Sequence, residues 1–135
     1  MPHIPLHVIE AGKPFTVSDS YGHSVEILPF RVMHGKLPIM GYRIGEMAWI
    51  TDMLTMPAAS YACLKNLDCL VINALRQEQH PTHQTVREAL AQISCIQPEE
   101  AFLIHASHQI GLHAEMEKEL PPHVHLTYDG MVIWL

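Results

Sequence analysis

Two short stretches decide the fold: Cys69-Leu70-Val71-Ile72-Asn73 and Ala101-Phe102-Leu103-Ile104-His105. Each begins with a continuous apolar run, the pattern of a strand that is buried on both faces. Between them, Thr85-x-x-Glu88 has the form of a capping box, which predicts that a helix starts at Thr85. Two buried strands with a helix between them are the sequence order of a parallel pair joined by a helical crossover. We therefore expect a sheet with parallel strands at the centre of the molecule.

The sequence on either side adds antiparallel strands and further helices. Upstream, apolar alternation and turn residues predict strands at 6–10, 15–17, 25–32, 40–44 and 47–51, and a helix at 57–66. Gly45-Glu46 is the expected tight turn between two of these strands. Downstream, we expect a helix at 112–120 and a C-terminal hairpin of 124–127 with 131–135. The predicted fold is α+β or α/β: a mixed sheet with helices on one face, in a single domain spanning 1–135.

Composition narrows the possible functions. The formal net charge is −6 and the eight Lys and Arg residues are scattered, so we expect no binding to long nucleic acid. No apolar stretch approaches the ~18 residues of a membrane span. The three cysteines are odd in number and lack CxxC spacing, which indicates a reduced, cytoplasmic protein: Cys63, Cys69 and Cys95.

Several polar side chains follow the predicted strands at their carboxyl ends. His34, Asp52 and His105 each come directly after a strand, and His83 lies in the loop after the strand ending at Ile72. Ligands bind at this edge in open sheets. Three imidazoles and one carboxylate suit zinc, manganese or iron. The alternative is that each histidine only caps its strand end or contacts solvent.

A series of short motifs, in order along nearly the whole chain, resembles the metallo-β-lactamase superfamily. The motifs are Met33-His34-Gly35-Lys36-Leu37, Gly41-Tyr42-Arg43-Ile44-Gly45, Ile50-Thr51-Asp52, Leu70-Val71-Ile72-Asn73-Ala74-Leu75-Arg76, His80-Pro81-Thr82-His83, Leu103-Ile104-His105-Ala106-Ser107-His108 and Tyr128-Asp129-Gly130. Within the superfamily they are most similar to the phosphoribosyl cyclic phosphodiesterase branch, with ribonuclease Z more distant. The resemblance implies half of an αββα sandwich, in which two mixed sheets pack face to face.

The resemblance also implies roles for individual residues. His34 corresponds to a ligand of the first metal, Asp52 to the aspartate that bridges two metals, and His105 to a ligand of the second. His83 is similar to a histidine that acts as a general acid or contacts the substrate phosphate. Two neighbouring cations can activate water and stabilise the leaving oxygen, which a histidine can then protonate.

The chain departs from the family at its defining signature, His-x-His-x-Asp-His, which supplies four metal ligands and does not occur here. The closest string, His123-Val124-His125, lacks the following Asp-His pair, and we interpret it as a solvated strand face. Met1 corresponds to the middle of a family member, so the chain resembles a C-terminal half. Asn73 stands where relatives often carry an acidic residue. We therefore expect a divalent metal, zinc or manganese, to bind this chain weakly or partially.

These observations give a main functional hypothesis and two alternatives. The main one is a metal-dependent hydrolase, phosphodiesterase-like, present as a truncated or split half that is inactive alone and whose substrate is a small phosphodiester. The alternative is a non-catalytic dimerising module that binds a metal or a partner chain. An oxygen-dependent iron protein with two histidines and a carboxylate fits the ligand types but fits the strand order poorly. Because half a sandwich leaves one sheet face bare, we expect a homo-oligomer or an N-terminal-half partner to cover it. The apolar side chains assigned to that face are Val71, Ile72, Leu103 and Ile104.

Overall fold

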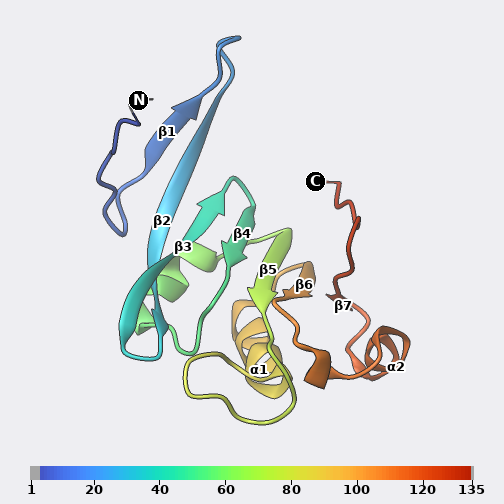
Figure 1. Cartoon of the computed structure of the whole chain (residues 1–135). Helices are drawn as coiled ribbons and strands as arrows, with labels where there is room; N and C mark the ends of the chain where they lie inside the picture. Colours follow the sequence, from blue (N-terminus) through green and yellow to red (C-terminus); the bar gives the residue numbers. More distant parts are fainter. Residues whose placement is uncertain (1–3, 135) are drawn as a thin grey trace.

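The computed structural model describes residues 4–134 as a seven-stranded sheet with short helices (Figure 1). The strand order in the sheet is the same as the order along the chain. The strands are β1 (Phe15–Ser18), β2 (Ser24–His34), β3 (Leu37–Ile44), β4 (Met47–Ile50), β5 (Cys69–Asn73), β6 (Glu100–Ile104) and β7 (Val124–Leu126). Neighbouring strands are antiparallel from β1 to β4 and parallel from β4 to β7, so the predicted mixed sheet is confirmed.

The antiparallel half is built around the long strand β2. Pro29 lies within β2 and does not end it, because β1 pairs with β2 only as far as Ile27 and no strand partner on that side needs an N–H from Pro29. The Pro29 carbonyl accepts a hydrogen bond from the Gly12 N–H on this side of β2. The N–H that proline lacks would lie on the same side, so its absence removes no hydrogen bond between strands. The predicted turn at Gly45-Glu46 joins β3 to β4. The strand expected at 6–10 is wrong, since these residues are irregular and mostly exposed.

The parallel half contains the predicted crossover. Helix α1 (Val86–Ile96) connects β5 to β6, and Thr85 and Glu88 form the capping box at its start. The helix packs against β5 through Val86, Ala89 and Ile93, which are all buried. Burial of these side chains, together with the cap, stabilises an 11-residue helix that would be marginal in isolation.

All the helices lie on one face of the sheet, as predicted. Besides α1 these are α2 (His113–Glu119) and two 3₁₀ segments, η1 (Ala58–Leu64) and η2 (His108–Ile110). Each contributes to the same buried cluster, through Leu64 of η1, Ile110 of η2 and Met116 of α2. The helix expected at 57–66 is present as η1, which is shorter than predicted and is a 3₁₀ helix, wound more tightly than an α-helix.

Within residues 4–134, no helix lies on the opposite face of the sheet, which we call the open face. Tyr42, Trp49, Val71 and Phe102 lie side by side across β3, β4, β5 and β6 on this face. Near Trp49, which is 44% exposed, there is an apolar hollow of about 390 Å³. It is lined by Ile9, Phe15, Ile27, Tyr42, Ile44, Met47 and Trp49.

The sequence-based assignment of residues to the bare face was half wrong. Val71 and Ile104 belong to the open face, but Ile72 and Leu103 are fully buried in the cluster beneath the helices. Side chains alternate between the two faces of a strand, so consecutive residues cannot share one face. A strand buried on both faces hides this alternation in its sequence.

The expected C-terminal hairpin is also wrong. A turn does form at the predicted place, where the Met131 N–H donates to the Tyr128 carbonyl. However, β7 pairs in parallel with β6, and residues 131–134 pair with no strand; Leu135 lies outside the described residues. No helix within residues 4–134 is long and apolar enough to cross a membrane.

Candidate metal centre

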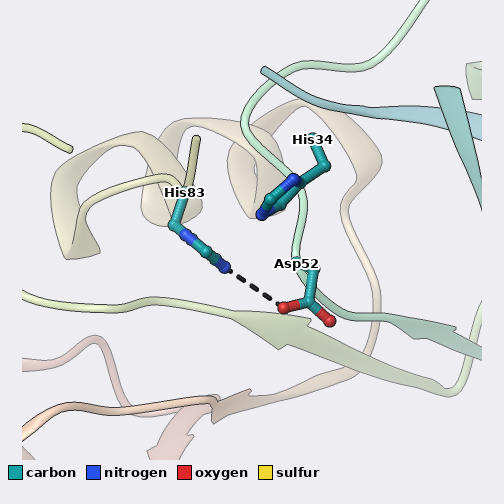
Figure 2. Close-up of side chains that lie close together, drawn as sticks. All are labelled: His34, Asp52 and His83. Carbon is teal, nitrogen blue, oxygen red and sulfur yellow. Dashed lines mark hydrogen bonds and ion pairs between the residues drawn. The ribbon is translucent and has the colours of Figure 1, made fainter. Parts of the chain in front are cut away.

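Four candidate side chains meet at one edge of the sheet, at the carboxyl ends of β2, β4 and β6. His34 is the last residue of β2, Asp52 follows β4, and His105 follows β6. His83 enters from the loop between β5 and α1. Figure 2 shows the side chains of His34, Asp52 and His83 pointing toward a common point.

The distances between these groups are short. One ligand atom from each of His34, Asp52 and His83 lies within 4.8 Å of the others. Asp52 Oδ1 is 3.1 Å from His83 Nε2 and 3.3 Å from His105 Nε2. Asp52 is thus the common partner of two imidazoles. The structure brings together all four residues singled out in the sequence.

His83 is at the centre of the histidine cluster. Its ring centroid lies 4.7 Å from that of His34, 4.9 Å from that of His105 and 5.0 Å from that of His80. Its Nδ1 atom is 3.0 Å from Thr82 Oγ1. The His83 side chain is 13% exposed, whereas Asp52 and His105 are each 40% exposed. His83 is therefore held from both ring nitrogens, with little freedom to reorient.

The electrostatic environment favours an ionised Asp52 and a neutral His80. Burial alone raises the pKa of Asp52, but hydrogen bonds from His83 and Thr51 and the charges of the nearby imidazoles outweigh it and lower the pKa. Loss of hydration, with repulsion from neighbouring His83 and Arg76, lowers the pKa of His80. The ionised carboxylate is the protonation state of an aspartate that binds divalent metals.

The backbone at two of these residues adopts the left-handed conformation, with φ of 56° at Asp52 and 62° at His105. Among the described residues other than glycine, only Asn66 and Gln97 share a positive φ. Such conformations are unfavourable for residues with a Cβ and occur frequently at functional sites. Both residues come after a strand whose carboxyl end borders the site, β4 for Asp52 and β6 for His105.

Sequence reasoning missed one residue of this region, Gln84. It is fully buried, and its side chain donates to the carbonyl oxygen of Asn73. In the sequence it sits in a polar loop directly before the helix cap, so no local pattern distinguishes it. Asn73, noted above for its lack of charge, is also fully buried, and its side chain bonds the backbone of Met53.

The donor set fits a divalent transition metal. Imidazole and carboxylate groups suit zinc, manganese and iron, and three donors converging within 4.8 Å are close enough for one ion. His105, which the sequence assigned as a ligand, is not one of that group of three, whereas His83 is.

Comparison with known proteins places the chain in a family. Residues 2–106 match the Beta-lactamase superfamily domain. The chain belongs to this family. A solved structure of a diphosphatase from the PhnP family is 34% identical, covers 79% of this chain and 42% of its own, and superposes with a TM-score of 0.77. The predicted recognition is confirmed.

More distant structures share the fold alone. The metallo-beta-lactamase fold protein YhfI from Bacillus subtilis is 18% identical (TM-score 0.70) and covers 91% of this chain and 53% of its own. Human tRNase Z, short form, is 17% identical (TM-score 0.64) and covers 90% of this chain and 46% of its own.

A relative of known sequence is more similar. An octanoyltransferase from Porphyromonas gingivalis is 44% identical over 131 residues, which are 96% of this chain and 26% of that protein. The chain thus spans about half or less of the relatives it matches.

Proposed function

We propose that the chain is part of a metal-dependent hydrolase that cleaves small phosphodiesters. The observation that carries the proposal is the convergence of His34, Asp52, His83 and His105 at one sheet edge. The 34% identity with a diphosphatase favours hydrolysis at a phosphorus atom. The net charge of −6 favours a small substrate over long nucleic acid.

The proposed division of roles gives His34, Asp52 and His105 to the metal and His83 to the substrate. A bound divalent ion, zinc or manganese, would supply Lewis-acid activation of water and of the phosphoryl oxygen. His83 would then protonate the leaving oxygen from Nε2, the atom that faces Asp52. Thr82 and His80, which both contact His83 Nδ1, would hold the ring in place.

The site in this chain alone is incomplete, because the four ligands of the family signature are missing from its sequence. We propose that a second sheet layer, carried by another polypeptide segment, covers the open face and brings those ligands to the site. A second copy of this chain would cover the face without supplying them. The free cysteines Cys63, Cys69 and Cys95 suit a cytoplasmic location for this assembly.

Manganese-dependent hydrolysis of bis(p-nitrophenyl) phosphate tests the proposal, measured with and without the segment that carries the signature. We expect the chain alone to be inactive and the combined protein to be active. Asp52→Ala and His105→Ala should each lower kcat/KM by more than about 100-fold, since even outer partners of metal ligands account for about 10–100-fold. His125→Ala is the matched control, because His125 pairs with Glu100 at the other end of β6. Activity in the combined protein that both changes leave intact would contradict the metal site.

A second candidate function is a non-catalytic module of a larger protein. The match to 26% of an octanoyltransferase favours it, because there a similar segment is one part of a longer chain. The discriminating measurement is the same assay with an octanoyl thioester as an additional substrate. Stable association with a partner chain, without hydrolysis of either substrate, would support the module and exclude the hydrolase.

A further inference from the structure

Two buried amides connect the loops that carry Asp52 and His83. Asn73 Nδ2 donates to the Met53 carbonyl at 2.9 Å, and Asn73 Oδ1 accepts from the Met53 N–H at 2.9 Å. The Gln84 N–H donates to the same Met53 carbonyl at 3.0 Å, and Gln84 Nε2 donates to the Asn73 carbonyl at 2.6 Å. All three residues are fully buried. We call Asn73, Met53 and Gln84 the amide bracket.

The amide bracket joins the residue after Asp52 to the residue after His83. Met53 follows Asp52 directly, and Gln84 follows His83 directly. Their backbones are bonded to each other and to the end of β5, so neither loop can shift without breaking bonds to the other. The bracket therefore fixes the relative position of the two loops, and with it the 3.1 Å contact between Asp52 and His83.

The chemistry of Asn73 suits this task better than that of a charged residue. One amide supplies a donor and an acceptor on adjacent atoms, which match the carbonyl and N–H of a single residue. An ionised carboxylate would accept from the Met53 N–H but could not donate to the Met53 carbonyl. The left-handed conformation of Asp52 persists only where its surroundings enforce it, and both bonds from Asn73 act on the next residue.

Gln84 carries a second sign that the bracket does more than stabilise the fold. Its Oε1 atom is buried and has no hydrogen-bond partner within the part of the chain that the structure describes. An unsatisfied buried acceptor is unfavourable, and an apolar side chain of the same length would avoid it. Stability alone thus gives little reason for a glutamine here. The hydrogen bond from Gln84 Nε2 to Asn73, which links the His83 loop to β5, does give a reason.

We propose that Asn73 is the positioning residue of the candidate metal site, acting with Gln84 to hold Asp52 in its left-handed conformation at a fixed distance from His83. The inference rests on the proposed metal site for its functional meaning. It assigns a role to a side chain that contacts neither metal nor substrate.

The first test needs no metal. Amide hydrogen exchange of the metal-free wild-type chain should show a protected Met53 N–H, and Asn73→Leu should accelerate that exchange and shift the resonances of Asp52 and His83. Ile72→Val, an adjacent buried change on the other face of β5, is the matched control and should leave both unaltered. A Met53 N–H that exchanges rapidly in wild type, or equally in the Asn73 variant, would overturn the proposal.

The second test uses Co²⁺ alone as the probe, followed by its visible absorption. Asn73→Leu should weaken Co²⁺ binding by about 10–100-fold and alter the band shape, as loss of outer partners of metal ligands does. Gln84→Met loses one bond and removes the unsatisfied Oε1, so it should unfold close to the wild-type temperature yet still weaken binding. Ile72→Val should leave the affinity of the folded protein within about twofold, since its effect is on packing alone.

The outcomes separate this inference from the proposed function. If wild type binds Co²⁺ and both bracket variants fold and bind it equally well, the positioning role is wrong and the metal site stands. If wild type binds no Co²⁺, the metal site of this chain alone is wrong, and the exchange of the Met53 N–H still decides whether Asn73 holds that loop. If Asn73→Leu does not fold, two other results test the positioning role. Weaker Co²⁺ binding by Gln84→Met and a protected Met53 N–H in wild type would support it, and wild-type affinity in Gln84→Met or rapid exchange would overturn it.

Discussion

At the scale of single residues, the role of His83 separates two interpretations of the site. It belongs to the group of three potential ligand atoms, with His34 and Asp52, and it is also the least exposed of the residues that pair with Asp52. A metal ligand and a proton donor make different demands on the same nitrogen, because a coordinated Nε2 cannot carry a proton. Substitution distinguishes the two roles.

We expect His83→Ala to leave the Co²⁺ affinity of the chain within about threefold of wild type and to lower kcat of the combined protein by about 10²–10⁴-fold, the usual contribution of a general acid. His105→Ala should instead weaken Co²⁺ binding directly. Isothermal titration of the chain and steady-state kinetics of the combined protein provide the two readouts. A His83→Ala affinity as low as that of His34→Ala would make His83 the third ligand.

Much of the candidate site could be predicted from the sequence, because strand ends locate residues without side-chain detail. His34 ends an apolar strand, Asp52 and His105 each follow one, and strands that run parallel end at the same edge. Gln84 could not be predicted, since its role depends on a hydrogen bond to Asn73, 11 residues away along the chain. Which imidazoles group around Asp52 is likewise a matter of a few ångströms, which strand positions do not specify.

At the scale of elements, β2 and β3 approach closely at Gly41. A Cβ at this position would lie 2.6 Å from the Phe30 ring atoms Cε2 and Cζ, and Phe30 is 1% exposed. Gly41→Ala should therefore destabilise the fold by about 1–3 kcal/mol, the usual cost of overpacking a core. Chemical denaturation gives the free energy of unfolding.

Phe30→Leu provides the control for Gly41→Ala. Alone it removes buried ring atoms and should destabilise the protein, but combined with Gly41→Ala it makes room for the new methyl group. The double variant should lose less stability than the sum of the two single changes. Strict additivity would show that the contact with Phe30 is not the cause.

The turn between β1 and β2 depends on Asp19. Its carboxylate accepts from the N–H groups of Tyr21 and His23 and contacts His23 Nδ1 at 2.8 Å. The His23 side-chain bond is the main reason that the pKa of Asp19 is lowered from 3.8. A carboxyl group whose pKa is lowered by folding stabilises the folded state above its unfolded pKa, and this stabilisation is lost as the pH falls through the lowered value.

Asp19→Ala should accordingly speed amide exchange in β1 and the start of β2 near neutral pH. The difference from wild type should shrink only in strongly acidic solution, below the ordinary pKa of an aspartate. Ser20→Ala in the same turn is the matched control. A difference that persists unchanged at the acid end would mean that the ionised carboxylate is not what orders the turn.

The elements that the sequence predicted well are those with a local signal. The capping box at Thr85 and Glu88 marks the start of α1, and Gly45 marks the turn between β3 and β4. The C-terminal hairpin failed because its turn residues, Asp129-Gly130, do form a turn, while the pairing of β7 is decided by β6. Partner choice between strands is a property of the whole sheet, and local residues do not determine it.

At the scale of the whole molecule, the two faces of the sheet differ in what covers them. One is covered by all the helices, and the other presents Trp49 and an apolar hollow. Contiguous apolar surface of this kind marks an interface in soluble proteins.

In isolation, the chain should associate with itself through the open face. Light scattering at micromolar concentration should show a mass above 15.3 kDa, and Trp49→Lys should shift it toward the monomer. Leu37→Lys, at a position that is 59% exposed at the start of β3, is the matched control and should not shift it. A wild-type chain that stays monomeric would argue against the open face as an interface.

The identical order of the strands in space and along the chain has a consequence for folding. Each strand docks on the one made just before it, so the sheet can grow during synthesis from the amino end without waiting for distant segments. The longest closure is that of β5 with β6, which encloses α1, and the cost of closing a loop rises only slowly with its length. The residues of the metal-site edge are therefore synthesised in the order His34, Asp52, His83 and His105, and His105 can join the other three only once the crossover through α1 has formed.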